Sequence, residues 1–239
     1  MSFLKTADEI NLMGDMAIVP VGSLEQHGPH LPVITDTVLA QEIANRIGER
    51  LGAFVLPCLP ISTAYEHKGK KGSVWMNPDT FFRMLCDIVL NLKGQGYKKV
   101  VVLRGHGGIF VMDPVIRHLN AEHNPGLLVC RLDPYFDNRV DEICETKCHI
   151  HAEEMETSIM LYLRPELVKM ERAVDFVPVV PREFLNYGSI FRYSPDGVWG
   201  FPCSASAGKG KLILESCVEE SIVYVNRVFN MMSSRDCGY

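Results

Sequence analysis

The chain has 239 residues, of which 47% are hydrophobic and 22% charged, and its formal net charge is −5. This composition excludes a disordered or collagen-like chain and a small disulfide-stapled protein, and it fits one large α/β domain. No basic patch indicates nucleic-acid binding, and no stretch reaches the roughly 18–20 apolar residues that a membrane span requires. The first residues lack the apolar core of a signal peptide, and the eight cysteines follow no framework spacing. We therefore expect reduced thiols and a cytoplasmic protein.

Four apolar runs rich in β-branched residues alternate with helical patterns along the first half of the chain. Each run has about the length of a strand and lacks polar alternation; the runs are 17–23, 53–62, 98–105 and 126–133. Helical spacing follows the start signals at Thr35-Asp36, Asn77-Pro78 and Asp113-Pro114. This alternation predicts an α/β three-layer sandwich, in which a mostly parallel central sheet has helices on both faces.

The pattern is looser after residue 134. A helix is predicted over 149–163, the stretch from Glu166 to Gly200 is rich in proline and turns, and a closing helix is predicted over 215–232. The chain has neither internal repeats nor a low-complexity linker. We therefore predict that residues 1–239 form a single domain.

Carboxylates and imidazoles follow three of the predicted strands. They lie where the carboxyl ends of parallel strands share one rim, which is where open α/β sheets place their chemistry; they are Glu25, His27, Asp36, His106, His151 and Glu154. Alone, each has an ordinary role, since Asp36 suits a helix N-cap and a histidine after a strand is most often a loop residue. Together they favour a metal site, and this ligand mixture suits zinc, manganese or iron(II).

The spacing of the first cluster suits two cations. Glu25 and His27 are two residues apart in an extended stretch, so their side chains point the same way. Asp36, at the start of a helix, can bridge two cations with its two oxygens. Two divalent ions roughly 3.5–4 Å apart would acidify a bridging water and polarise a carbonyl group.

The segment GSLEQHGPHLPVITD resembles the signature of the creatininase family, in which Glu-x-His is followed by Asp nine residues after the His. The resemblance continues through 62–67, 105–108 and 151–158. It implies a three-layer α/β fold, a dinuclear divalent-metal site and hydrolysis of small cyclic amides or formamides. By this resemblance the metal ligands are Glu25, His27, His106 and a bridging Asp36. His151 matches a proton donor to the leaving group, and relatives form hexamers, so a homo-oligomer is expected.

The chain departs from creatininase itself at the second metal. Creatininase has Gly-His-Tyr-Glu, whose Glu binds that metal, whereas Gly108 stands here. We predict that Glu154 replaces this carboxylate, because it lies three residues after His151 on the same face of the predicted helix and where the Gly-His-Gly-Gly branch of the family has a Glu. Glu156 is interpreted as a structural group and Glu153 as solvated.

Further departures lie near the expected substrate pocket. The residues assigned to substrate binding are Glu66, His67, Arg104, Gly107 and Gly108. Arg104 stands where the branch usually has Asn, and Lys70 and Lys71 alter a Phe-Pro-Gly segment. These basic residues can meet an anionic or polyhydroxylated substrate, although the lysines also suit a solvated loop.

The sequence therefore predicts a hydrolase with two divalent ions per chain, Zn, Mn or Fe. Asp36 bridges them, Glu25 and His106 hold one ion, and His27 and Glu154 hold the other. A metal-bridging hydroxide would cleave a C–N bond of a small polar substrate, with no nucleic-acid or membrane partner. One alternative is C–C hydrolysis of a cyclic polyol ketone of the 3-dehydro-scyllo-inosose type. Another is a non-catalytic metal-dependent binding protein, against which the intact candidate ligands argue.

Overall fold

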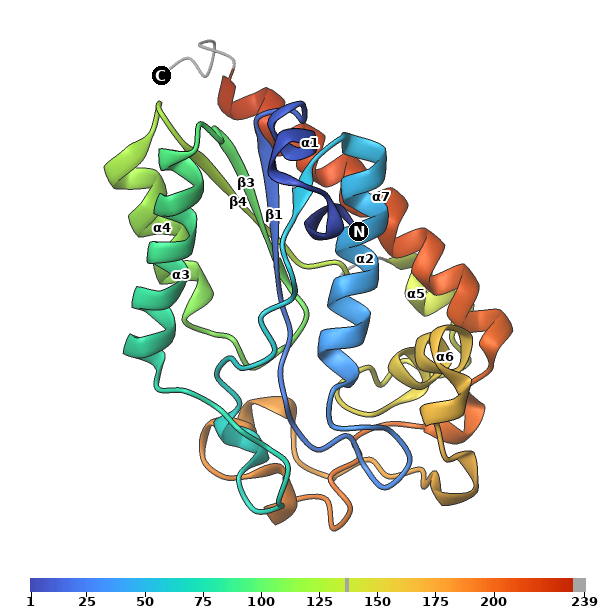
Figure 1. Ribbon diagram of the computed structural model, residues 1–239. Coiled ribbons are helices and arrows are strands. Elements are labelled where there is room, and N and C mark those ends of the chain that lie inside the picture. Colours follow the sequence, from blue (N-terminus) through green and yellow to red (C-terminus); the bar gives the residue numbers. More distant parts are fainter. Residues whose placement is uncertain (136–137, 234–239) are drawn as a thin grey trace.

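The computed structural model describes residues 1–135 and 138–233. Its centre is a parallel sheet with the strand order β2-β1-β3-β4 (Figure 1). The strands are β1 (Met16–Val21), β2 (Phe54–Val55), β3 (Lys99–Arg104) and β4 (Leu128–Leu132). Helices cover both faces, so the predicted three-layer α/β sandwich is confirmed. The prediction of one domain over residues 1–239 reaches past the described residues and stays a prediction.

Each face of the sheet is buried under its own pair of helices (Figure 1). One face carries α3 (Pro78–Gly94) and α4 (Met112–His123), and the other carries α2 (Thr35–Leu51) and α7 (Ala207–Ser233). Within β3, Val100 and Val102 pack into the first core, whereas Val101 and Leu103 pack into the second. Because successive side chains of a strand point to opposite faces, a strand between two cores needs apolar residues throughout. This explains the absence of polar alternation in the sequence.

The remaining helices are short: α1 (Ala7–Asn11), α5 (Asn138–Ile143) and α6 (Glu154–Leu163). No helix within the described ranges is long and apolar enough to cross a bilayer. The seven cysteines of the described residues are free thiols, and Cys237 lies outside those residues.

The second strand and the closing helix differ in length from their predictions. Only Phe54 and Val55 of the run 53–62 form a strand, because Pro57 and Pro60 interrupt the donors that a longer ladder needs. The closing helix begins at Ala207, eight residues before the predicted start at 215.

The predicted helix over 149–163 begins five residues late, at Glu154. Glu153 is its N-cap, and its side chain accepts hydrogen bonds from the backbone N–H groups of Met155 and Glu156. Ala152 has a positive φ of 51°, so the chain turns sharply just before the helix. His151 therefore precedes the helix and shares no helical face with Glu154.

Residues 164–206, which we name the roof segment, run as loops and 3₁₀ turns across the carboxyl ends of the strands (Figure 1). The segment is anchored beside the sheet by a two-residue antiparallel bridge, in which the backbone N–H of Trp199 donates to the carbonyl of His151 at 2.9 Å. Trp199 is 2% exposed. The loops before α3 lie at the same end of the sheet as the roof segment.

Candidate metal centre

Seven side chains rich in ligand atoms converge under the roof segment. They form three groups whose ligand atoms lie within 4.8 Å of one another: Glu25 with His67 and His106, Glu25 with His27 and His151, and His27 with Asp36 and Glu156. Six of the seven are buried, and Glu156 is nearly so. The structure thus brings together Glu25, His27, Asp36, His106 and His151, as the sequence predicted, and it adds His67 and Glu156.

Glu25 lies at the centre of the cluster. One carboxylate oxygen, Oε1, lies 3.1 Å from Nε2 of His67, and the other, Oε2, lies 3.1 Å from Nδ1 of His106. Neither oxygen has a hydrogen bond of normal geometry, although the side chain is fully buried. An unsatisfied buried carboxylate is costly. Convergent carboxylate oxygens and imidazole nitrogens are ligands that zinc and similar cations accept, so these residues fit a bound divalent metal.

Asp36 faces a different histidine with each of its oxygens. Oδ1 lies 3.0 Å from Nε2 of His27, and Oδ2 lies 3.1 Å from Nδ1 of His106. Ser23 Oγ donates to Oδ2 at 2.9 Å. Gly22 permits this approach, because a β-carbon there would lie 2.6 Å from the Cα of Thr37. Asp36 is the second residue of α2 and forms no capping hydrogen bond, so its carboxylate is directed to the cluster instead of the helix end.

The structure does not bring Glu154 to the cluster, which corrects the sequence prediction. Its carboxylate accepts hydrogen bonds from the backbone N–H groups of Glu145 and Thr146, from Thr146 Oγ1 and from Lys209 Nζ. The prediction assumed a helix that already included His151. Glu153 was also placed wrongly: it is fully buried and caps α6.

Glu156 is the carboxylate that reaches the cluster from α6. Its Oε2 accepts a hydrogen bond from the backbone N–H of Ala152 at 2.7 Å and lies 3.9 Å from Nε2 of His27. With Glu153 as N-cap, Glu156 is the third helical residue, and side chains at that position turn back toward the residues before the helix. That capping pattern is the sequence signal that would have selected Glu156.

His106 lies between two sets of carboxylates. Its Nδ1 faces Glu25 and Asp36, and its Nε2 lies 3.2 Å from Oε1 of Glu66. A β-carbon at Gly108 would lie 1.7 Å from that Glu66 oxygen, so only glycine leaves room for it. The carboxylate of Glu66 thus occupies the space beside Gly108. It contacts the His106 ring at Nε2, on the side away from Glu25 and Asp36, and so orients that ring.

Gln26 orients two further histidines. Its backbone carbonyl oxygen lies 2.7 Å from Nε2 of His151, and its side-chain Nε2 lies 3.0 Å from Nδ1 of His67 and 3.1 Å from Nε2 of His151. A carbonyl can only accept, so the shorter contact is a hydrogen bond in the tautomer that carries the ring hydrogen of His151 on Nε2. In that tautomer Nδ1 is unprotonated, and it lies 3.6 Å from Oε1 of Glu25.

The charges of the cluster favour added positive charge. Burial lowers the pKa of His27, but the carboxylates of Asp36 and Glu156 outweigh burial and raise that pKa to about 10. Burial likewise lowers the pKa of His106, and the carboxylates of Glu25, Asp36 and Glu66 raise it well above its usual value. Burial raises the pKa of Glu156 to about 8, against the opposing charge of His27. Without metal, bound protons thus offset the negative charge of these carboxylates. Metal ions would compete with those protons for the same side chains.

A cavity of about 40 Å³ opens onto the cluster. Four of the predicted substrate-binding residues line it: Glu66, His67, Gly107 and Gly108. The roof segment contributes residues that the sequence did not single out, namely Arg182, Leu185 and Ile190. They carry no local signal, because only the path of the folded roof segment brings them over the strand ends.

Arg104 does not line this cavity, contrary to the prediction. It is the last residue of β3, and its Nε donates to Oδ1 of Asp133, just beyond the neighbouring strand β4. Lys70 and Lys71 do not line the cavity either. Both lysines are exposed in the loop that follows the cavity residues Glu66 and His67.

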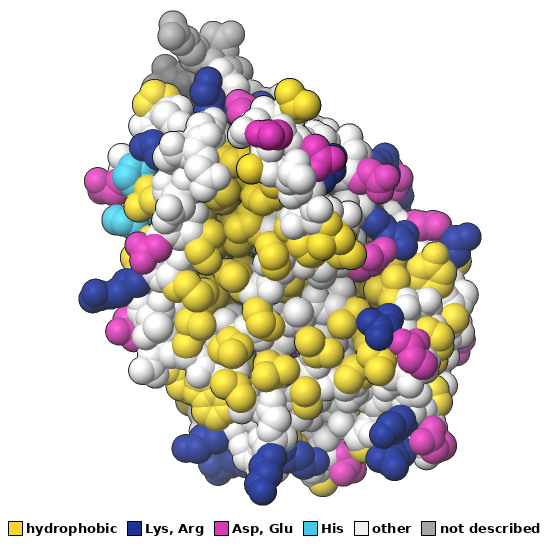
Figure 2. All heavy atoms as spheres, viewed as in Figure 1, with side chains coloured by type: hydrophobic (Ala, Val, Ile, Leu, Met, Phe, Trp, Pro, Cys, Tyr) yellow, Lys and Arg dark blue, Asp and Glu magenta, His cyan; other side chains and the backbone are white. Residues whose placement is uncertain are grey.

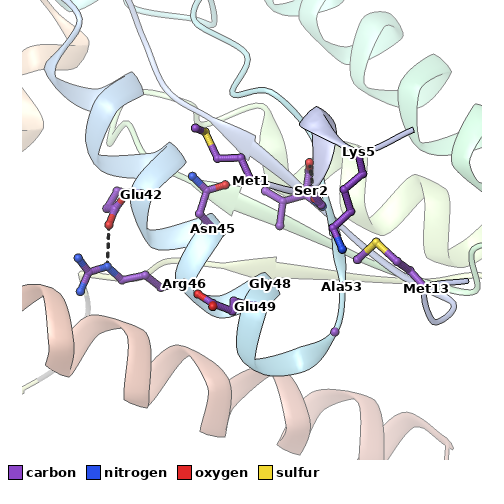
Figure 3. A pocket seen from close by; sticks show the side chains of 12 residues that line it. Met1, Ser2, Lys5, Met13, Glu42, Asn45, Arg46, Gly48, Glu49 and Ala53 are labelled. Carbon is purple, nitrogen blue, oxygen red and sulfur yellow. Dashed lines mark hydrogen bonds and ion pairs between the residues drawn. The ribbon is translucent and has the colours of Figure 1, made fainter. Parts of the chain in front are cut away.

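A roomier pocket, of about 740 Å³, lies near the amino terminus and the last turns of α2 (Figure 3). It is lined by 12 residues, among which Arg46 donates to Glu42 at 2.7 Å (Figure 3). None of these residues is a histidine, an aspartate or a cysteine. The pocket therefore lacks the side chains that distinguish the smaller cavity over the cluster.

Residues 4–225 match a family model described as creatininase, creatinine amidohydrolase. The 3-dehydro-scyllo-inosose hydrolase of Thermotoga maritima is 31% identical over 185 residues, which cover 74% of this chain and 58% of that protein. The creatinine amidohydrolase of Pseudomonas putida is 28% identical over 230 residues, which cover 86% of this chain and 87% of that protein. The chain thus matches less than two thirds of the inosose hydrolase's length.

Solved structures agree over almost the whole chain. A creatininase variant described as the Zn-Zn type has a TM-score of 0.80 and 26% identity, with 96% of this chain and 97% of that chain covered. A structure described as creatininase with Mn has a TM-score of 0.81 and 26% identity, with the same coverage.

Proposed function

The chain belongs to the creatininase family of hydrolases, and from this premise we propose that it is a divalent-metal-dependent hydrolase that cleaves a C–N bond of a small polar substrate. The substrate class is a cyclic amide or a formamide. The observation that carries the proposal is the buried carboxylate of Glu25, whose oxygens face two imidazole nitrogens at 3.1 Å without a hydrogen bond to satisfy them. Intact candidate ligands also argue against a non-catalytic binding protein.

Two cations fit this set of ligands. Asp36 is the shared ligand in our proposal, because its oxygens face His27 on one side and His106 on the other. Glu25 and His106 would hold one cation, and His27 and Glu156 the other, so Glu156 takes the role first given to Glu154. When bound, such ions supply an acidified water and a polarised substrate carbonyl.

His151 is the proposed proton carrier. Its Nε2 hydrogen is engaged by the carbonyl of Gln26, so Nδ1 is free to take a proton from the attacking water and to deliver it to the departing nitrogen. The antiparallel bridge to Trp199 and the hydrogen bond to Gln26 together hold the ring over the cluster. Glu66, whose Oε1 lies 3.2 Å from Nε2 of His106, would keep that ring in one orientation.

C–C hydrolysis of a cyclic polyol ketone is the second candidate. It is favoured by the 31% identity to the inosose hydrolase, and the same side chains would serve it. Release of a carboxylate without any amine would distinguish this reaction from C–N hydrolysis.

We further propose zinc or manganese as the resident metal, a homo-oligomeric assembly and a cytoplasmic location. The metal proposal is supported by the two creatininase structures described by those metals, and by the mixed carboxylate and imidazole set. The free thiols of the described cysteines are compatible with the cytoplasm.

The decisive experiment is the metal content of protein purified without chelator, measured by elemental mass spectrometry with the protein quantified independently. Close to two transition-metal ions per chain are expected, and that metal would then be used to screen lactams, formamides and keto-inositols. If only trace metal is found and none is taken up from added zinc, manganese or iron, the hydrolase proposal is refuted.

A further inference from the structure

We propose that the substrate carries a carboxylate group, and that Arg182 of the roof segment binds it. This inference rests on the proposed hydrolase function and names the substrate class of the same cavity. Arg182 is the one Lys or Arg that lines the cavity in the described part of the chain. It begins the 3₁₀ turn Arg182–Asn186, whose Leu185 lines the cavity beside it.

The guanidinium of Arg182 closely approaches the strand-end loop that carries His106. A β-carbon at Gly107 would lie only 2.9 Å from Nη2 of Arg182, so the glycine leaves room for the cation. Arg182 nevertheless forms no salt bridge with any described carboxylate, although Glu66 and Glu156 line the same cavity. A guanidinium is always charged and presents a planar fork that matches a carboxylate. An unpaired guanidinium in this position is available to a ligand.

The backbone around Arg182, whose own side chain is exposed, is held by contacts within the roof segment and to the loop before α3. The carbonyl of Phe184 accepts a hydrogen bond from the hydroxyl of Tyr193 at 3.1 Å, and the two rings pack edge to face with centroids 6.2 Å apart. Further along, Ser189 Oγ donates to the carbonyl of Lys68. These contacts join the roof segment to itself and to the loop before α3, so they fix the path of the backbone from which Arg182 reaches Gly107.

The outer edge of the same end of the molecule carries several basic side chains. Figure 2 shows Lys and Arg side chains along the lower edge, with some Asp and Glu among them, where the roof segment and the loop before α3 lie. Lys68, Lys70 and Lys71 are exposed in that loop and form no salt bridge with the described residues. Lys70 Nζ lies 4.9 Å from the ring centre of Phe191, which is next to the cavity residue Ile190. Such an edge attracts anions toward the cavity, and the attraction weakens with salt.

The shape of the guanidinium group favours a carboxylate. Its planar fork can engage both oxygens of a carboxylate at once. The metal ions proposed for the cluster would offset its carboxylates, so a substrate anion can approach it. Arg182 is the basic side chain that lines the cavity on the roof side.

The test compares two ligands that differ by one charge. The probes are 5-oxoproline, a lactam with a carboxylate, and its carboxamide, and binding to the metal-loaded full chain is measured by isothermal titration calorimetry. We expect the wild type to bind the acid about tenfold more tightly than the amide, the size of one partly exposed charged pair. R182Q should lose this preference, and R182K should keep part of it. R192Q, which removes one charge from the same segment outside the cavity, should keep it fully.

The outcomes separate this inference from the proposed function. If the wild type shows no preference for the acid, or binds neither probe, the inference is overturned. It is also overturned if R182Q keeps the preference, because the carboxylate would then be held by the metals. Preferential binding that depends on Arg182 supports the inference even if neither lactam is hydrolysed, a result that would count only against C–N cleavage. In the wild type, raising the salt concentration should reduce the preference.

Discussion

Replacing Glu156 by glutamine is expected to remove one metal ion per chain while leaving the fold intact. The amide loses the charge that attracts a cation beside His27, 3.9 Å away. It keeps an oxygen that can accept the hydrogen bond from the Ala152 N–H, so the stability cost should stay below about 1 kcal/mol. Loss of an outer partner of a metal ligand typically weakens metal affinity about 10–100-fold, and loss of a ligand should cost at least as much.

The matched control is E154Q, which should keep the full metal content but lower the stability of the fold. Glu154 accepts four hydrogen bonds, from two backbone N–H groups, Thr146 Oγ1 and Lys209 Nζ, and none comes from the cluster. The glutamine side chain is uncharged, and its NH2 group is a donor that would face the donors now bound by the carboxylate. We expect a loss of about 2 kcal/mol in the free energy of unfolding, because a hydrogen bond to a charged group contributes on this scale. In a chain of this length that lowers Tm by about 4–8 °C.

Elemental mass spectrometry and thermal unfolding on the same preparations decide between the two glutamates. The expected pattern is about one metal ion per chain and a nearly unchanged Tm for E156Q, against full metal content and a lowered Tm for E154Q. The unfolding of E154Q should be compared at saturating metal, since bound metal itself raises Tm. A full metal complement in E156Q, or a lost ion in E154Q, would refute the assignment of Glu156 as a ligand.

Three further predictions concern proton transfer, metal affinity and the space beside the cluster. H151A should abolish turnover with metal content unchanged, and product formation at the wild-type rate would exclude His151 as the proton carrier. At pH 7 the metal-free protein should hold protons on His27, with its pKa raised to about 10, and on Glu156, with its pKa raised to about 8. Metal binding must displace these protons, so the apparent affinity should rise between pH 6 and pH 8, and calorimetric titrations that give a constant affinity would contradict this. G108A should lower kcat/KM by about a hundredfold while the metals stay bound. The added β-carbon would lie 1.7 Å from Glu66 Oε1 and displace that carboxylate. An unchanged kcat/KM would show that the position of Glu66 does not affect catalysis.

The layers of the fold could be predicted because its strands are buried on both faces. Val100 to Leu103 alternate between two cores, and such strands produce uninterrupted apolar runs that stand out in a sequence. The end of a run is less informative. Apolar residues continue to Leu59 and Ile61 after β2 has ended, and Leu59 packs against the core without belonging to a regular strand.

The cluster could be predicted best where its residues lie in the segments that leave the carboxyl ends of the strands. Glu25 and His27 follow β1, Asp36 lies in the first turn of α2 and His106 follows β3, and the structure brings them together. The choice between the glutamates before α6 depended on where that helix begins, and one left-handed residue, Ala152, moved the start. Single backbone reversals of this kind leave little trace in hydrophobic periodicity.

Arg182 illustrates a different limit. Its position over the cavity depends on the path of about forty residues of turns, and each turn is stabilised by contacts that are distant in the sequence. Arg104 and the lysines before α3 were better candidates by their nearness to the motifs. The structure turns Arg104 toward Asp133 instead, because a strand-end side chain can follow the sheet as readily as the site.

The roof segment also affects how a protein of this kind can change over generations. The groups proposed for hydrolysis come from the segments after β1 and β3 and from the starts of α2 and α6, next to closely packed cores, so substitutions there are rarely tolerated. Of the roof side chains that line the cavity, Ile190 is buried, but Arg182 is exposed and Leu185 is half-buried, so substitutions at these two positions cost less stability. A lineage can therefore acquire a new substrate by drift in the roof segment while the older chemistry underneath is inherited intact. Relatives named for creatinine and for an inosose are what such a history would leave.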